Sequence, residues 1–377
     1  RPSEMLDQIY RIQTITGERV SNIVVMGSGE PMDNYDNLIR FIHLLTDEHG
    51  LNISQRNITV STCGIVPGIL KLAEDYEDIH FILSKDTKMS PNFMKKHGIP
   101  ERAKKCIEYV IPDFNIDQIA RSGQCFRFRR EEEGRYSLIA GGKWLDIEQN
   151  GETVRFSCTE NEFEGFWRDY FDLNADYGRY KSKVAKRDAY LRAAVETGSG
   201  LRILRQELWE TIICFIISQQ NNIPRITKCV DGLCTLFGEA RQRENGEVYH
   251  AFPTAERLAQ CTPEELSPIR LGYRAKYICA TARQVASGAV DLEKVARMKY
   301  ADAKNELLRL TGVGIKVAEC ICLFGLHHID AFPIDTHIRQ MLDAHYPKGF
   351  PLTRYRGFAG VMQQYAFFFE LETQNNR

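Results

Sequence analysis

The chain has 377 residues, of which 43% are hydrophobic and 26% are charged. These values are typical of a folded protein with two or three domains, and they exclude a largely disordered chain. No apolar run reaches the ~18 residues of a membrane-spanning helix, so we expect no membrane partner. We find no secretion signal, and the 11 cysteines are scattered. We therefore expect reduced thiols and a cytoplasmic location.

The net charge of −1 conceals a difference between the two ends of the chain. Residues 1–80 hold 6 Lys and Arg against 12 Asp and Glu, so the remainder carries a net charge of +5. A positive excess favours contact with DNA, but an excess this small does not by itself indicate nucleic acid.

Strand and helix patterns alternate over residues 1–85. Residues 23–26 predict a buried strand that ends at a glycine loop, Gly27-Ser28-Gly29-Glu30-Pro31, and residues 57–64 predict a second strand. Helical stretches follow at 38–45 and 67–73. This order is typical of a parallel α/β sheet.

The same segment resembles the radical S-adenosylmethionine RNA methyltransferases that modify adenine C2. The resemblance rests on the glycine loop, on Leu51–Arg56 and on Ser61-Thr62-Cys63-Gly64. It implies a cofactor site at Gly29, Glu30 and Ser61. The family's C-x-x-x-C-x-x-C cluster motif is absent, so we expect that site to be vestigial. We interpret residues 1–85 as an incomplete barrel without chemistry of its own, followed by a linker over 86–105.

Short alternating segments over residues 106–182 predict an antiparallel β-sheet domain. They are separated by Gly141-Gly142 and Asn150-Gly151, which are dipeptides typical of tight hairpins. Residues 183–377 predict an all-helical domain, in which the apolar stretch Leu208–Ile217 should be the central helix. The predicted class of the whole chain is therefore α+β.

A helix–hairpin–helix pattern occurs late in the helical domain, at Leu310-Thr311-Gly312-Val313-Gly314-Ile315-Lys316. Gly312 and Gly314 allow a positive φ and a close approach of another backbone. The amides at the start of the second helix suit a DNA phosphate. The same positive helix end disfavours the ammonium form of Lys316, and a neutral amine is a nucleophile. Asp335 lies where the cap of a further helix belongs.

These residues together resemble the 8-oxoguanine DNA glycosylases that also cut the strand, and the resemblance covers nearly all of 108–370. It implies that Lys316 attacks the sugar carbon, that Asp335 stabilises the developing charge, and that double-stranded DNA containing 8-oxoguanine is the substrate. No cofactor is expected to be required, although the hairpin can share a structural monovalent cation with a phosphate. No four-cysteine run follows the hairpin, so we expect no iron–sulfur cluster, and we expect a monomer.

The resemblance assigns further residues by their positions in the family's motifs. The residues implied to contact the damaged base, which the protein extrudes from the duplex, are Gly123, through its carbonyl, and Cys320, Gln363, Phe367 and His337. On the side of the DNA and of the base left without a partner, they are Gln220, Arg225, Tyr273, Arg274, Gly312 and Gly314. Three positions depart from the family: Gln220 replaces an asparagine, Thr311 a proline and Phe324 a methionine. We expect the threonine to loosen the hairpin.

Other interpretations are open at this point. Taken singly, a lysine at a hairpin is usually solvated, an aspartate before a helix is usually only a cap, and a glycine can merely turn a strand. A helix–hairpin–helix domain can bind DNA without catalysis, although the pair Lys316 and Asp335 argues against this. The first section suggests an RNA methyltransferase, against which the missing cluster cysteines argue.

Overall fold

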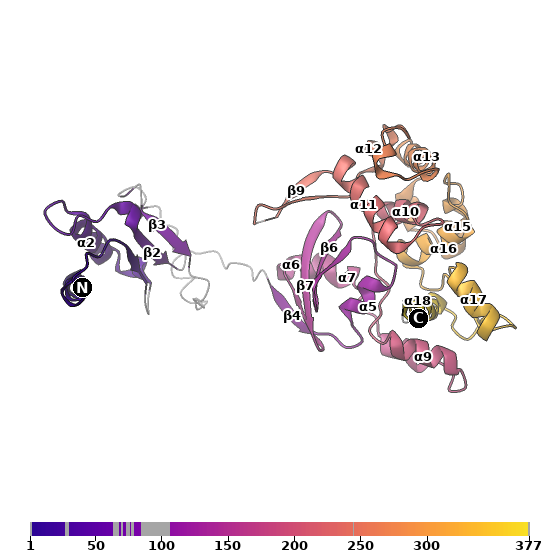
Figure 1. The fold of residues 1–377 in the computed structure, drawn as a ribbon. Helices are drawn as coiled ribbons and strands as arrows, with labels where there is room; N and C mark the ends of the chain where they lie inside the picture. Colours follow the sequence, from indigo (N-terminus) through magenta and orange to yellow (C-terminus); the bar gives the residue numbers. More distant parts are fainter. Residues whose placement is uncertain are drawn as a thin grey trace. The chain divides into compact units, whose positions relative to one another are not determined.

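The structure is a computed structural model that describes residues 2–26, 30–62, 68, 71–72, 76, 79–83, 106–243 and 245–375. The chain forms two compact units, Arg1–Ala103 and Lys104–Arg377 (Figure 1). The predicted linker over 86–105, and most of the predicted helix over 67–73, lie outside the described residues. Within the described ranges, no helix has the length and apolar character needed to cross a membrane.

The first unit contains a three-stranded parallel sheet in the order β1-β2-β3, with Ile23 opposite Ile58 and Thr59 opposite His80. The two predicted strands are confirmed, but the expected burial of the first is wrong. Val24 is 50% exposed, because it points to the face of the sheet opposite Ile23 and Val25, which pack against the core of this unit. The elements are α1 (Pro2–Thr16), β1 (Ile23–Val25), η1 (Pro31–Asn34), α2 (Tyr35–Thr46), η2 (Gln55–Asn57), β2 (Ile58–Thr62) and β3 (His80–Leu83).

The second unit begins with a five-stranded antiparallel sheet in the order β4-β8-β7-β6-β5. The predicted meander is confirmed: the Gly141-Gly142 turn joins β6 to β7, and both glycines have positive φ. The edge strand β4 was not expected. The elements of this part are β4 (Ile107–Val110), α5 (Ile116–Arg121), β5 (Phe128–Glu132), β6 (Arg135–Ala140), β7 (Lys143–Asn150), β8 (Thr153–Phe156), α6 (Glu160–Glu162), η3 (Phe163–Trp167), α7 (Arg168–Tyr170) and α8 (Tyr177–Ser182).

Helices make up most of the remainder of this unit, and the α+β class is confirmed. They are α9 (Ala189–Thr197), α10 (Leu208–Ile217), α11 (Ile223–Phe237), α12 (Ala255–Ala259), η4 (Ser267–Ile269), α13 (Arg274–Ala286), α14 (Leu292–Ala296), α15 (Tyr300–Leu307), α16 (Ile315–Phe324), α17 (Thr336–His345) and α18 (Ala359–Asn375). A small hairpin, β9 (Ala240–Gln242) with β10 (Val248–His250), interrupts them.

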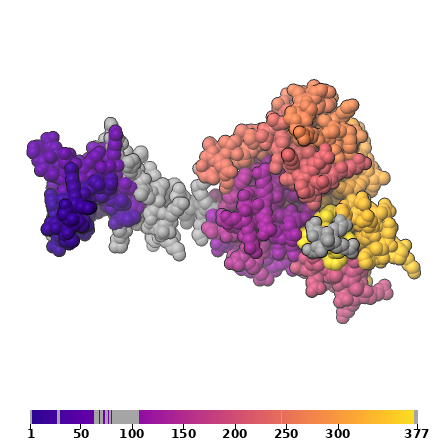
Figure 2. Space-filling view, viewed as in Figure 1, coloured from indigo at the N-terminus to yellow at the C-terminus, as the bar shows by residue number. Residues whose placement is uncertain are grey.

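In the second unit, the sheet and the helices each contribute residues to the other's hydrophobic core. Phe126, which lies just before β5, belongs to the helical core, whereas Leu204, which lies just before α10, belongs to the core of the sheet. The two parts therefore pack directly on each other (Figure 2). As predicted, α10 is the central helix, because every residue from Thr211 to Ile217 is buried.

A buried ion pair joins the sheet to α10. Arg127 Nη1 lies 3.6 Å from Glu210 Oε2, and the two side chains are 3% and 12% exposed. Burial raises the pKa of Glu210 to about 7 from its ordinary 4.5, although the charge of Arg127 opposes the shift. The free-energy cost of burying the charged carboxylate of Glu210 therefore exceeds the stabilisation that Arg127 provides.

This pair predicts a pH-dependent stability. An acid whose folded pKa is raised stabilises the fold fully below its unfolded pKa, and that stabilisation is lost as the pH rises through about 7. From about pH 5 to about pH 8, the free energy of unfolding should fall by roughly 2–3 kcal/mol more in the unaltered chain than in Glu210→Gln. Denaturant unfolding followed by tryptophan fluorescence measures this, since Trp144, Trp167 and Trp209 all lie in the second unit.

The exposed Glu239→Gln substitution is the control and should keep the unaltered pH slope. Equal slopes for the unaltered chain and Glu210→Gln would show that Glu210 ionises normally in the fold.

Candidate active site

The hairpin between α15 and α16 contains two glycines with different tasks. Gly312 has φ +84°, and a Cβ on it would lie 2.6 Å from Cγ of Tyr277, so both its backbone and its lack of a side chain are required. Gly314 caps α16 with φ −91°, and a Cβ on it would meet nothing within 4 Å. The expectation of a positive φ is therefore confirmed for Gly312 and wrong for Gly314, which needs no left-handed backbone.

Side chains from α13 and from the turn after α10 hold the hairpin. The Thr311 amide donates to Gln284 Oε1 at 2.8 Å, and Thr281 Oγ1 donates to the Thr311 carbonyl at 2.6 Å. Gln219 Nε2 donates to the Gly312 carbonyl at 2.9 Å. These bonds fix the backbone of Thr311, and a proline there would have no amide to give to Gln284.

Lys316 lies in the first turn of α16 and is half-buried. Its Nζ is 5.5 Å from the ring centroid of Phe215, on the central helix α10. One turn further along α16 lies Cys320, a buried thiol close enough to interact with the Lys316 amine. The amine is therefore turned toward the protein and not out into bulk water.

Asp335 caps the neighbouring helix α17, where its Oδ1 accepts the Ile338 amide at 2.8 Å. Its carboxylate also acts on Cys320. Burial raises the pKa of that thiol to about 11, the Lys316 ammonium opposes the shift, and the Asp335 carboxylate adds to it. Lys316 and Asp335 thus both act electrostatically on one neutral thiol from the starts of two helices. In the described part of the chain they form no direct ion pair within 4.0 Å, so the amine is not tied to the carboxylate.

A buried carboxylate on α16 ties this helix to the segment that precedes α17. Glu319 is 7% exposed and accepts from Tyr300 Oη at 2.6 Å and from the Phe332 amide at 3.2 Å. It also pairs with Lys304. Because Phe332 lies three residues before Asp335, Glu319 links α15, α16 and the segment that leads into α17.

Four of the residues predicted to contact the base lie on adjoining segments. Gly123 has φ +72°, and a Cβ on it would lie 3.2 Å from Cε1 of Phe367. Phe367 in turn makes an edge contact with His337, at a centroid distance of 5.9 Å. Gln363 is one turn before Phe367 on α18, and its Nε2 donates to the Pro333 carbonyl at 3.1 Å.

The other end of the Gln363 amide has no partner. Its Oε1 is buried and accepts no hydrogen bond from any part of the chain that the structure describes. Leaving a buried amide oxygen unpaired costs stability. Such an oxygen calls for an explanation, for example a hydrogen-bond donor on a ligand. Gln363 therefore has an unused hydrogen-bond acceptor in this structure.

The residues predicted to contact the DNA have different surroundings. Gln220 is exposed with φ +47°, Tyr273 is 45% exposed, and exposed Arg225 donates to the Arg270 carbonyl at 3.3 Å. Arg274 is only 5% exposed. Its guanidinium bonds the carbonyls of Gln219, Gln220 and Leu271. In this structure Arg274 thus holds the turn that carries Gln220, and its role toward a base stays a prediction.

Three residues of this region were not expected from the sequence. Gln219 joins the hairpin to the Tyr273–Arg274 loop, because its amide donates to Gly312 while its carbonyl accepts from Arg274. Phe215 supports Lys316 and stacks on Phe324 at 5.4 Å. Gln364 contacts the Gly123 turn. Each acts across a long separation in the chain, and no local pattern marks it.

The vestigial cofactor site predicted in the first unit is only partly visible. Gly29 lies outside the described residues. The Glu30 carboxylate accepts from the Met32 amide at 3.0 Å and from Thr62 Oγ1 at 2.7 Å, and Ser61 lies beside Thr62 on β2. The Glu30 side chain therefore caps a turn and links it to β2.

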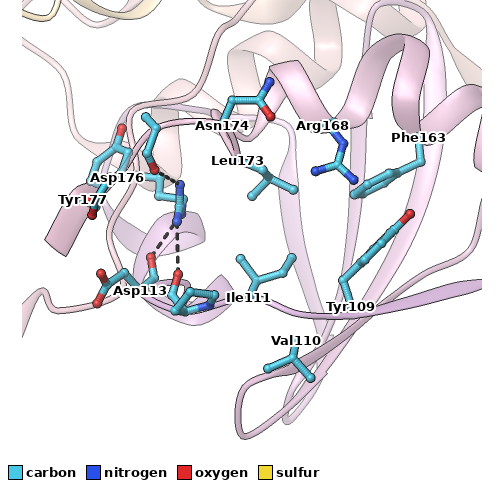
Figure 3. A pocket seen from close by; sticks show the side chains of 13 residues that line it. Tyr109, Val110, Ile111, Asp113, Phe163, Arg168, Leu173, Asn174, Asp176 and Tyr177 are labelled. Carbon is cyan, nitrogen blue, oxygen red and sulfur yellow. Dashed lines mark hydrogen bonds between the residues drawn. The ribbon is translucent and has the colours of Figure 1, made fainter. Parts of the chain in front are cut away.

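A cavity of about 350 Å³ lies away from all these residues, at the edge of the sheet (Figure 3). Its wall includes Tyr109 stacked on Phe163 at 4.7 Å, with Arg168 above both rings. Arg168 is already paired with Glu164, and the buried Arg202 donates to four backbone carbonyls. The two arginines of this cavity are thus used by the protein itself.

The two hairpin glycines give a matched pair of substitutions. Gly312→Ala should lower the free energy of unfolding by about 2–4 kcal/mol, because it combines an unfavourable φ with a clash against Tyr277. Gly314→Ala should cost about 1 kcal/mol or less, as expected for a weaker cap without a clash. Denaturant unfolding followed by tryptophan fluorescence measures both. A larger loss in Gly314→Ala than in Gly312→Ala would contradict this description of the hairpin.

Two protein-family models match the second unit. The 8-oxoguanine DNA glycosylase N-terminal domain matches residues 107–212, and the HhH-GPD superfamily base excision DNA repair protein matches residues 213–348. The boundary between the matches falls inside α10, so together they span both the sheet and the hairpin.

Known proteins give the same result for this unit. The chain resembles the structure of Clostridium acetobutylicum 8-oxoguanine glycosylase/lyase in complex with dsDNA containing cytosine opposite to 8-oxoG. The TM-score is 0.67, with 33% identity, 72% of this chain and 97% of that chain covered. It is also 40% identical over 158 residues to the N-glycosylase/DNA lyase of Saccharomyces cerevisiae, which covers 39% of this chain and 42% of that protein.

A separate segment resembles a different protein. The chain is 84% identical over 142 residues to the probable dual-specificity RNA methyltransferase RlmN of Lachnospira eligens, covering 37% of this chain and 38% of that protein. The chain therefore spans less than half the length of each of these two curated relatives. Both resemblances found in the sequence are confirmed.

Proposed function

The chain belongs to the 8-oxoguanine DNA glycosylase family, and from this premise we propose that it excises 8-oxoguanine from duplex DNA and then cuts the strand. The observation that carries the proposal is that Lys316 lies in the first turn of α16 and Asp335 caps α17, and that both act electrostatically on the buried Cys320. A nucleophile and a carboxylate so placed are what this reaction requires.

Lys316 is the proposed nucleophile. The Nζ lone pair forms a bond to the sugar C1′ while the glycosidic bond breaks, and the electron pair of that bond leaves with the base, which takes up a proton. The sugar ring then opens to give an imine between Lys316 and C1′. The imine acidifies the proton on C2′, and loss of that proton expels the 3′ phosphate. Hydrolysis of the imine returns the free lysine.

Asp335 is the proposed stabiliser of positive charge on the sugar. Its Oδ1 is already fixed by the Ile338 amide, so little reorganisation is needed when the charge develops. The thiol of Cys320 remains neutral, since burial holds its pKa near 11. Cys320 therefore offers a soft, uncharged surface to a flat base.

The remaining residues suit recognition of an extruded base. The unpaired Gln363 Oε1 can accept from the base edge, and the ring of Phe367 beside Gly123 offers a stacking face. Exposed Tyr273 can wedge into the stack that the base has left. The hairpin amides can bind a phosphate. A protein that only bound DNA would need neither Lys316 nor Asp335 in these places.

Borohydride trapping tests the nucleophile. With a duplex containing 8-oxoguanine opposite cytosine, the chain should form a covalent adduct that Lys316→Gln does not form. Release of 8-oxoguanine should fall about 10³-fold or more in that variant. The exposed Lys294→Gln should trap as the unaltered chain does. If Lys316→Gln released the base at the unaltered rate, the proposed function would be wrong.

Asp335→Asn separates the charge of Asp335 from its structural role. Asparagine caps a helix as well as aspartate does, so α17 should remain intact and the melting temperature nearly unchanged. Base release should nevertheless fall by about 10²–10⁴-fold, because the negative charge is gone. Single-turnover release of 8-oxoguanine measures this. An unchanged rate in a folded Asp335→Asn would limit Asp335 to capping.

A further inference from the structure

Two adjacent glutamines on α18 reach opposite walls of the proposed base site. Gln363 Nε2 donates to the carbonyl of Pro333, two residues before Asp335. Gln364 Nε2 donates to the carbonyl of Ser122, directly before Gly123, at 2.7 Å. The second bond joins residues 242 positions apart, and Gln364 and Ser122 are 2% and 0% exposed. In Figure 1, α18 accordingly lies between α5 and α17.

The turn that Gln364 contacts is tightly organised. Ser122 ends α5, its Oγ donates to the Ile119 carbonyl at 2.7 Å, and the same Oγ accepts from Gln124 Nε2 at 2.8 Å. Gly123 follows with φ +72°. Because the Ser122 carbonyl belongs to the peptide group that precedes Gly123, the bond from Gln364 restrains the rotation of that peptide group.

The chain after Gly123 is held from the other side. Gln124 is fully buried: its Nε2 also donates to the Arg202 carbonyl, and its Oε1 accepts the Leu204 amide, both at 2.8 Å. Gln206 Nε2 donates to the Gln124 carbonyl at 2.7 Å. In contrast, the carbonyl of Gly123 itself accepts no hydrogen bond from any residue that the structure describes.

We propose that Gln364 is a positioning residue that fixes the Gly123 carbonyl and so lets the site distinguish 8-oxoguanine from guanine. This inference rests on the proposed function. The oxidised base carries a hydrogen on N7 that can donate to a carbonyl, whereas N7 of guanine presents a lone pair that a carbonyl repels. Both the attraction and the repulsion require that the Gly123 carbonyl keeps a fixed direction.

Removing the Gln364 amide should release that restraint. In Gln364→Met the side chain keeps its length and its apolar stem, but the buried Ser122 carbonyl loses its partner. A buried carbonyl without a partner is costly, and rotation of the peptide toward another donor relieves the cost. The Gly123 carbonyl would then lose its fixed direction. Lys316 and Asp335 lie on other helices and should keep their geometry.

The test compares two reactions of the full chain. Release of 8-oxoguanine opposite cytosine requires recognition of the base, whereas nicking of a pre-formed abasic site requires Lys316 but no base. In Gln364→Met, single-turnover release should fall about 10- to 100-fold, while nicking stays within about threefold. The ratio of Kd values for undamaged and 8-oxoguanine duplexes should also move toward one. Rates are normalised to molecules trapped by borohydride on the abasic site, so misfolded chains do not count.

Gln118→Met is the matched control. Gln118 lies on α5, the helix that ends at Ser122. Like that of Gln364, its side chain bonds backbone groups: the Thr197 carbonyl at 2.9 Å and the Gly200 amide at 2.8 Å. Neither group belongs to the Gly123 turn. Gln118→Met should leave the ratio of the two rates unchanged. A parallel fall of both reactions in Gln364→Met, or a fall of neither, would overturn the inference. If the unaltered chain failed to nick or to trap, the proposed function itself would fall, and this inference with it.

Discussion

Lys316 and Asp335, at the starts of two different helices, both act electrostatically on the buried thiol of Cys320, and the rest of the site depends on how those two helices are placed. Each of the two side chains lies on a separate helix, so their arrangement is set by the positions of both helices. The Gly312 turn sets where α16 begins, and Tyr277 packs against that turn. Glu319 then ties α16 to the segment that leads to Asp335. Substitutions at these supporting residues would displace the reacting groups without removing any of them.

Buried polar groups, in addition to apolar packing, connect the sheet to the helices around the site. Gln124, Gln206 and Gln364 each give an amide hydrogen to a backbone carbonyl on or beside the Gly123 turn or the loop before α10. Such bonds specify direction, which apolar contacts do not. Gln363 differs from them in that its Oε1 is buried and has no hydrogen-bond partner among the residues that the structure describes. The walls of the site are thus held by hydrogen bonds, and one buried acceptor in it is left unpaired.

Features that depend on neighbouring residues could be predicted from the sequence. Paired turn dipeptides indicated the meander, an apolar run indicated α10, and Asp335 was placed correctly as a cap. Features that depend on distant partners could not. Nothing near Arg274 shows that it is buried against the carbonyls of residues 219 and 220, and nothing near Gly314 shows that its φ is negative. The edge strand β4 lacks the clear alternation that marked the inner strands.

The central claim is that one particular amine bonds to deoxyribose during the reaction. The most direct measurement is proteolysis of the borohydride-reduced complex with 8-oxoguanine DNA, followed by mass spectrometry of the peptide that carries the nucleotide. The account predicts that the sugar is attached to Lys316, in the peptide that includes Val317 and Cys320. Attachment to any other amine, such as Lys304 or the amino terminus, would contradict it.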